Sequence, residues 1–106
     1  MTYASYSGAS SVVSEVPQEV TLLTGATNGT LIRSLEISNP TENAGVLTIK
    51  REDASSDEYG EFSISVASGT YIILWEDCQV FVPYNHDLIV VGDVDGIQVV
   101  ANCWEI

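Results

Sequence analysis

The sequence predicts an all-β protein, a single-domain β-sandwich or jelly-roll-like fold of about eight short, mainly antiparallel strands with an extended N-terminal arm. Short runs alternate between apolar and polar residues, and clusters of Gly, Pro, Asn and Asp separate them at near-regular spacing. No stretch has the period of a helix. The chain has 106 residues, 45% of them hydrophobic and only 17% charged, which suits one packed domain rather than a disordered chain.

The clearest strand signal lies in residues 30–50, which form two predicted strands joined by a polar turn. In the first strand Leu31, Leu35 and Ile37 share one side of a pattern with period two, as expected when one face is buried. Asn39-Pro40 ends that strand, because proline cannot donate to a sheet ladder and Asn-Pro favours a turn. The second strand resumes at residues 46–50.

The N-terminal segment lacks this periodicity. Residues 1–11 are mainly Tyr, Ser, Ala and Gly, so we expect a flexible or partner-ordered arm there, followed by the sandwich domain over residues 12–106. Tyr3 and Tyr6 give the arm side chains to bury against a neighbouring subunit. One or two short strands broken at Pro17 are expected next.

The second half of the chain continues the strand pattern. After an acidic loop at residues 52–58, Phe62, Ile64 and Val66 alternate with polar residues, which predicts a strand with one wet face. Residues 70–75 are apolar on both faces, as in a central strand or in one covered by another subunit. Further strands are predicted over 78–82, 88–91 and 97–104.

The charge balance excludes one class of partner. Fifteen Asp and Glu oppose Arg33, Lys50 and Arg51, for a formal net charge of −12. Three basic residues cannot form the footprint that nucleic-acid binding needs, so this charge favours solubility over a specific role. No apolar run approaches the roughly 20 residues of a membrane-spanning helix, and we expect neither a membrane partner nor a secretory signal.

No catalytic constellation is present, so we expect no enzyme, no cofactor and no metal site. His86 is the only imidazole and lies between ordinary turn residues. Asp93 and Asp95 resemble the first half of a calcium loop, but the later Glu is missing, so an Asp-Gly hairpin turn is favoured. Cys78 and Cys103 are expected to be reduced, although neighbouring strands would permit a bridge, and they lack the spacing of a zinc site with His86.

Aromatic residues are the best candidates for contact with partners. Besides the two tyrosines of the arm, these are Tyr71, Trp75, Tyr84 and Trp104. In a small β domain such residues serve as core or subunit contacts more often than as a sugar-stacking platform, which stays the alternative.

Over residues 16–106 the chain resembles the small all-β virion proteins of tailed bacteriophages, the group of capsid cement or decoration proteins and neck and tail accessory proteins. The likeness lies in Thr21-Leu-Leu, the run from Leu31 to Asn39, the turn from Val66 to Thr70, the turn from Asp93 to Gly96, and Glu105. None of these patterns carries a catalytic residue.

The resemblance implies a non-enzymatic virion structural protein, above all a capsid cement or decoration subunit assembled in the host cytoplasm. Its partners would be itself, as a dimer or trimer, and other virion proteins such as the major capsid protein. A neck, tail or baseplate accessory protein is the alternative in this class. From a different class, a carbohydrate- or receptor-binding sandwich module remains.

Overall fold

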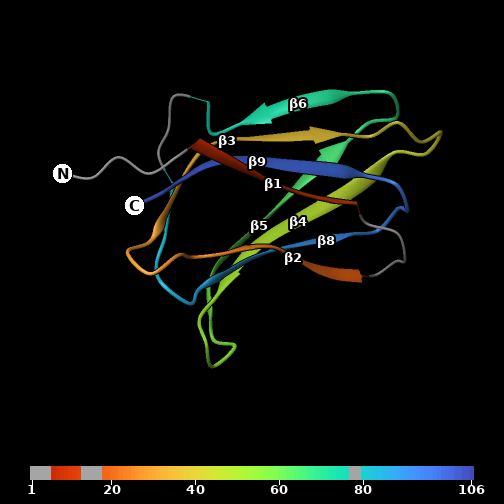
Figure 1. Ribbon diagram of the computed structural model, residues 1–106. Helices are drawn as coiled ribbons and strands as arrows, with labels where there is room; N and C mark the ends of the chain where they lie inside the picture. The colour runs from red at the N-terminus through yellow and green to blue at the C-terminus, as the bar shows by residue number, and fades with distance from the viewer. Residues whose placement is uncertain (1–5, 13–17, 77–79) are drawn as a thin grey trace.

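The structure is a computed structural model that describes residues 6–12, 18–76 and 80–106, with residues 6–12 and 18 in their backbone only. These residues form nine strands and no helix (Figure 1). The strands are β1 (Tyr6–Val12), β2 (Gln18–Thr24), β3 (Thr30–Ser38), β4 (Gly45–Glu52), β5 (Glu58–Val66), β6 (Tyr71–Leu74), β7 (Val80–Val82), β8 (Asp87–Gly92) and β9 (Gln98–Glu105).

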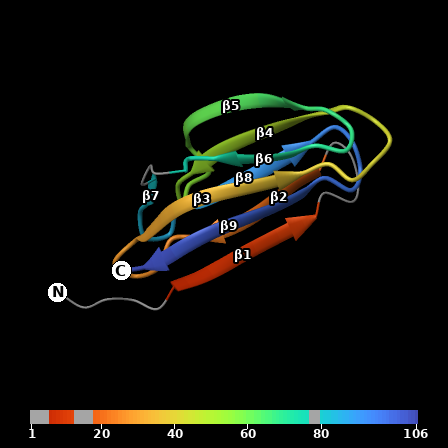
Figure 2. The ribbon, with the colours of Figure 1, turned by 90° about the horizontal axis from the view of Figure 1, so that it is seen from above.

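The strands form two antiparallel sheets that face each other as a sandwich (Figures 1 and 2). One sheet has the order β1-β9-β3-β6, with β7 also paired to β3, and the other has the order β2-β8-β4-β5. β6 and β7 lie along the same side of β3 in one direction, so they act as a single interrupted edge strand. The nested pairs β1–β9, β2–β8, β3–β6/β7 and β4–β5 then give the strand order of an eight-stranded jelly roll, which confirms the predicted fold class.

The core lies between the sheets and is built by alternation along the central strands. Leu35 and Ile37 are fully buried, as predicted, but Leu31 is not part of that face. A β-bulge between Ile32 and Ser34 shifts the register against β9, so Ile32 takes the inward position and Leu31 turns to the outer face. The prediction that Leu31 belongs to the buried face was therefore wrong, because the bulge changes which residues of β3 point inward.

The polar turn after β3 is held by a buried asparagine. Asn39 is fully buried, and its Nδ2 donates to the carbonyl oxygens of Asn43 at 2.8 Å and of Val66 at 3.1 Å. Its Oδ1 accepts a hydrogen bond from the Thr41 backbone at 3.1 Å. Asn39 thus satisfies the turn's backbone groups from inside the fold, which explains why a polar side chain is tolerated there.

Part of the expected N-terminal arm is an edge strand in the structure. β1 pairs with β9 from Tyr6 opposite Trp104 to Val12 opposite Gln98. The small polar residues of this segment carry no alternating apolar pattern, so the backbone ladder with β9, rather than side-chain burial, identifies the strand. Tyr3 lies outside the described residues.

The strand that is apolar on both faces lies at a sheet edge. β6 ends the order β1-β9-β3-β6, so the expectation of a central strand is wrong. Ile72 and Leu74 pack against the core, whereas Tyr71 and Ile73 point outward and are 58% and 41% exposed. Coverage of this outer face by another subunit, the other interpretation of the pattern, stays a prediction.

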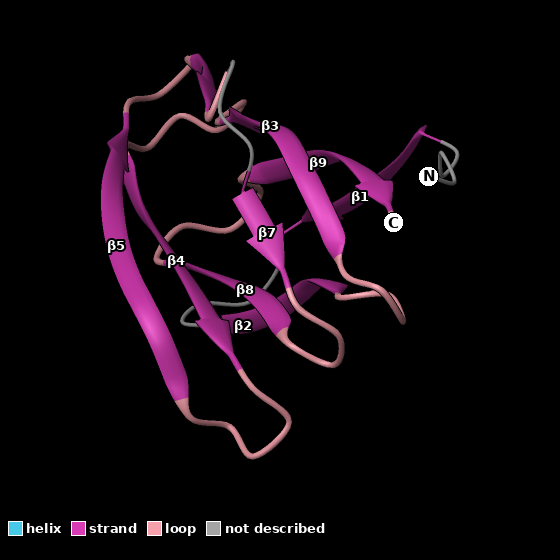
Figure 3. Ribbon diagram, turned by 90° about the vertical axis from the view of Figure 1, so that its left-hand side faces the viewer, coloured by secondary structure: helices cyan, strands magenta, loops and turns pink. Residues whose placement is uncertain are grey.

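The side of the sandwich formed by β5 and by β6/β7 is less closed than the opposite side. On the opposite side β1 and β2 contact each other, whereas on this side β5 lies apart from β7 in Figure 3. The predicted alternation of β5 is present, but its apolar face is unevenly covered: Val66 is buried, Ile64 is half-buried and Phe62 is 38% exposed. This exposed stretch of inner face forms one wall of the site described next.

Candidate binding cleft

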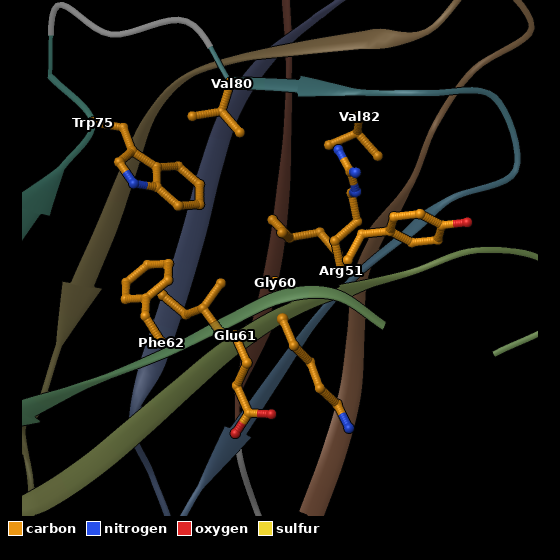
Figure 4. Close-up of a pocket in the computed structure, with 11 residues that line it drawn as sticks. Arg51, Gly60, Glu61, Phe62, Trp75, Val80 and Val82 are labelled. Atoms are coloured by element: carbon orange, nitrogen blue, oxygen red, sulfur yellow. The ribbon is translucent and has the colours of Figure 1, made fainter. Parts of the chain in front are cut away.

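A cleft of about 350 Å³ lies between the two sheets on this side of the sandwich (Figure 4). One wall comes from β4 and β5, and the other comes from β7 and from Trp75, which follows β6 directly. Its walls are mainly apolar, formed by Ile49, Phe62, Trp75, Val80, Val82 and Leu88. The cleft is therefore a continuation of the hydrophobic core that reaches the surface.

Two aromatic rings face each other across the cleft. Phe62 of β5 and Trp75 have ring centroids 5.8 Å apart and planes tilted by 59°, a favourable edge-to-face type of contact. Trp75 has a positive φ of 59°, a left-handed conformation that is uncommon for a bulky residue. Strained backbone of this kind is concentrated at sites where the position of a side chain matters.

Arg51 brings a positive charge into this apolar environment. Its guanidinium carbon lies 5.3 Å from the centre of the Tyr59 ring, and its Nη1 donates to the Phe81 carbonyl oxygen at 3.4 Å. The Nε of Arg51 is buried and has no hydrogen-bond partner. Within the described part of the chain, no carboxylate lies within ion-pairing distance of Arg51, although acids outnumber bases fivefold.

Tyr59 is fixed under Arg51 by the acidic loop. The Tyr59 hydroxyl donates to Asp53 Oδ2 at 3.1 Å, which raises the pKa of Tyr59. Asp53 Oδ1 accepts from the backbone of Asp57 at 3.0 Å and of Ser55 at 2.8 Å, and these bonds, with the Asp57 amide first, lower the pKa of Asp53. The loop that the sequence presents as an acidic cluster is thus an ordered turn that supports the cleft.

The imidazole of His86 also lies against the ring of Tyr59. Their ring centroids are 5.4 Å apart, and His86 Nδ1 is buried without a hydrogen-bond partner. No nucleophile within hydrogen-bonding distance of this imidazole is found among the described residues. The arrangement is therefore a packing contact of the kind that positions Tyr59.

The adjacent residue Lys50 has the opposite environment. Lys50 borders the cleft, but because side chains alternate along β4 its amine faces the outer side of the sheet, whereas Ile49 and Arg51 face the cleft. Lys50 Nζ lies 2.5 Å from Glu19 and 3.3 Å from both Glu52 and Glu58. The hydrogen bond to Glu19 above all holds the pKa of Lys50 above its ordinary range.

The outer face of the other sheet carries a second polar network. Tyr71 donates its hydroxyl hydrogen to Glu36, and Asn102 Nδ2 donates to Glu36 Oε2 at 2.9 Å. These bonds, with Tyr71 first, lower the pKa of Glu36, and the same contact raises the pKa of Tyr71. Nearby, the guanidinium carbon of Arg33 lies 5.9 Å from the Trp104 ring centre.

The aromatic residues predicted as partner contacts therefore fall into separate places. Trp75 lines the cleft, while Tyr71 and Trp104 lie on the outer face of the sheet that contains β3. Tyr84 is 58% exposed in the loop before β8, and Tyr6 is described only as backbone opposite Trp104. Tyr71, Trp75, Tyr84 and Trp104 hence do not form one shared stacking platform.

Sequence reasoning missed the residues that give the cleft its chemistry. Arg51, Tyr59 and Phe62 were not among the predicted contacts. The usable signal was the parity of β4, since Arg51 has the same orientation as the buried Leu47 and Ile49. A cation on the apolar side of an alternating strand marks a position where the core meets either solvent or a ligand.

The other candidates have local structural roles. Asp93 Oδ1 accepts a hydrogen bond from the Val46 backbone at 2.6 Å, and Gly96 has a φ of +98°, as a tight turn requires. Among the described residues, no group of three or more metal-ligating side chains gathers. Cys103 is buried, and Cys78 lies outside the described residues, so the expectation that both are reduced stays a prediction.

No family model matches the chain, and a search of curated proteins finds no significant match. Across the described residues, no helix is long and apolar enough to cross a membrane.

Proposed function

We propose that this protein is a non-enzymatic virion structural protein, a capsid cement or decoration subunit that acts as a homo-oligomer. The observation that carries the proposal is a group of large apolar side chains left exposed on the interrupted edge strand. Tyr71, Ile73 and Phe81 are 58%, 41% and 45% exposed, and all three face outward from β6 and β7.

At Phe81 this group continues as a row of apolar side chains across the outer face of the sheet; these residues together are called the patch below. Phe81 lies opposite Leu31 in the β7–β3 register, and Leu31 lies opposite Trp104 in the β3–β9 register. Leu31 and Trp104 are half-buried. Single exposed apolar residues are ordinary, but a row that crosses three strands and contains two aromatic rings has the composition of an interface core.

The charge of the chain favours burial of this patch rather than of other surface. With a net charge of −12, copies of the protein repel each other over most of their surface. Electrostatic repulsion between copies is then smallest where apolar residues predominate. Glu36, which lies near the patch, is already hydrogen-bonded to Tyr71 and Asn102. A strongly acidic subunit is also suited to the outside of a particle, since it does not compete for the packaged nucleic acid.

The oligomeric state tests the proposal directly. Analytical ultracentrifugation of the full chain over a wide concentration range should give a dimer or trimer, and Phe81→Lys should shift it to monomer. Tyr84→Lys is the control, because Tyr84 is also an exposed aromatic residue but lies in the loop between β7 and β8 rather than on a strand of the patch. A monomer at every concentration that also fails to sediment with phage particles would refute the proposal.

A neck, tail or baseplate component is the alternative within the same class. Gold-labelled antibody against the protein, viewed on whole virions by electron microscopy, separates the two positions. Label over the whole capsid surface supports a decoration subunit, whereas label at the portal or tail supports the accessory role.

A carbohydrate- or receptor-binding module is the alternative from a different class. The observation in its favour is the Phe62–Trp75 pair at the cleft, since exposed rings are common sugar-contact surfaces. A glycan array should then give a hit that Trp75→Ala abolishes, and an array without hits would remove this alternative.

A further inference from the structure

We propose that the cleft binds a small hydrophobic carboxylate, an aryl or alkyl acid whose body packs against Phe62 and Trp75 and whose carboxylate pairs with Arg51. The cleft is lined by Val80 and Val82 on the inner side of β7, whereas the patch uses Phe81 on its outer side, so the assignment does not rest on the proposed virion role. It would give the protein a ligand-binding activity in addition to its structural contacts.

Arg51 has no carboxylate partner among the described residues. A guanidinium offers five N–H donors, and its only hydrogen bond to the described residues is the long one from Nη1 to the Phe81 carbonyl. Its Nε is buried without a partner. Nε itself is enclosed by protein atoms, so a carboxylate in the cleft would accept hydrogen bonds from the Nη groups, whose one bond to a described residue is the long bond to Phe81.

The size of the cleft and the chemistry of its walls also suit a small hydrophobic ligand. The volume of about 350 Å³ lies at the small end of the range for small-molecule sites, which fits a ligand of roughly ten to fifteen heavy atoms. Ile49, Phe62, Trp75 and Val82 offer an apolar enclosure for such a body. Mostly apolar walls with a few charged groups at their border are the usual pattern of a small-ligand site.

The polar groups at the cleft favour a hydrophobic acid over a sugar or a phosphate. A sugar needs several free donors and acceptors, but the Tyr59 hydroxyl is engaged by Asp53 and Lys50 by three glutamates. A phosphate dianion needs more than one free cation, but Lys50, the second cation that borders the cleft, is already paired with three glutamates, and Glu61 also borders the cleft. The planar fork of one arginine matches a single carboxylate in a bidentate contact.

Arg51 is already held in place by its contacts with Tyr59 and Phe81. Tyr59 lies under the guanidinium at 5.3 Å and is itself fixed by its hydrogen bond to Asp53. Because both groups are ordered before any ligand arrives, little side-chain freedom is lost on binding. The cleft therefore offers a preorganised receptor.

The test is an NMR titration of the full chain with phenylacetate and, as matched control, with phenylacetamide. We expect phenylacetate to shift the Trp75 indole N–H and the Arg51 Nε–H signals in a saturable way. The neutral amide has the same body without the charge and should bind roughly tenfold to a hundredfold more weakly, the factor for losing a charge-assisted hydrogen bond. Absence of saturable shifts, or equal binding of acid and amide, would overturn the proposal.

Variants locate the site. Arg51→Met keeps an unbranched apolar stem without the charge and should weaken phenylacetate binding by the same factor, with the amide signals of the core strands unchanged. Arg33→Met removes a cation from the outer face beside Trp104 and should leave binding unchanged. An equal loss in both variants would mean general attraction to positive charge and would reject the site. Arg51→Lys keeps the charge without the planar fork and should weaken phenylacetate binding by a smaller factor than Arg51→Met does. It is the second variant to measure if Arg51→Met does not fold.

Two sources supply this chemistry, a free acid and the C-terminal residue of a polypeptide. A tripeptide that ends in phenylalanine with a free carboxylate, set against the same tripeptide with a C-terminal amide, separates them. Tighter binding of phenylacetate points to a free acid, and tighter binding of the free-carboxylate peptide points to a chain terminus. Both results support the site, whereas failure of both ligands rejects it while leaving the oligomer test of the virion role unaffected.

Discussion

Lys50 and Arg51 are adjacent cations on β4, yet one is surrounded by carboxylates and the other by apolar side chains. Lys50 lies on the outer face with Glu19, Glu52 and Glu58 within 3.3 Å. Arg51 faces the cleft, where it stacks on Tyr59 and its Nε has no partner. In a chain with fifteen acids, proximity in sequence did not decide which cation is paired.

The difference shows that strand parity controls the electrostatic environment more than composition does. The outer face of the sheet is wet and acidic, so any cation there finds partners at little cost. The inner face is built from core residues, so acids are excluded from it and a cation placed there stays unpaired. We infer that Lys50 stabilises the fold, whereas Arg51 is available to pair with an anion.

The largest effect is expected from the inner face itself. Ile49 is 1% exposed and lies next to both cations, so Ile49→Ala should lower the free energy of unfolding by about 2–5 kcal/mol through lost burial and a residual cavity. Urea denaturation followed by tryptophan fluorescence measures this. A loss below about 1 kcal/mol would mean that the inner face is not a packed core at this position.

A smaller loss is expected at Lys50. Lys50→Met removes the cation that three glutamates share and leaves their charges facing one another, so we expect a loss of roughly 1–2 kcal/mol at low salt. Added salt should reduce the difference from the unmodified protein, because screening weakens the repulsion. A loss that does not depend on salt would assign the role of Lys50 to its packed methylene stem instead.

Arg51→Met should have almost no effect on stability, within about 0.5 kcal/mol of the unmodified protein. The substitution loses the stacking on Tyr59 but removes an unpaired buried donor, and these contributions oppose each other. The same urea measurement made on both variants tests the comparison. Equal destabilisation by Lys50→Met and Arg51→Met would contradict the distinction drawn between the two cations.

The pH dependence of stability provides the finest test. The pKa of Asp53 is lowered in the folded protein, chiefly by the backbone amide of Asp57, so the folded state prefers the charged form. This contribution is fully present above the ordinary pKa of an aspartate and is lost as the pH falls through the lowered folded value. Asp53→Asn should therefore show a flatter stability profile at acidic pH than the unmodified protein. Parallel profiles would show that Asp53 is not held by the turn.

Much of the scaffold was readable from local pattern, and the failures have specific causes. The alternation of Phe62, Ile64 and Val66 gave the strand and its face, but not the fact that the opposite sheet leaves Phe62 partly uncovered. Leu31 was assigned to the buried face because a β-bulge leaves no mark in the period of two. The segment of β1 was missed as a strand because its backbone ladder needs no apolar side chain.

The candidate site was less predictable than the fold. Trp75 was identified as a contact residue, but its partner Phe62 and the charge at Arg51 come from other strands and meet it only in three dimensions. Trp75 and Trp104 were grouped as aromatic residues, yet the structure places them on different surfaces. Residue type alone does not show which tryptophan lines the cleft and which lies on the outer face of the sheet.

By itself, the sequence determined the all-β class, the approximate number of strands, the turn at Asn39 and the acidic surface, because each depends on a period or a residue preference within a few positions. Only the tertiary structure decided that β6 is an edge strand, that β1 joins the protein's own sheet, and that Arg51 enters an apolar cleft. These features depend on which strands become neighbours. That choice is made by long-range burial and backbone pairing between segments as distant as β1 and β9, so no local pattern contains it.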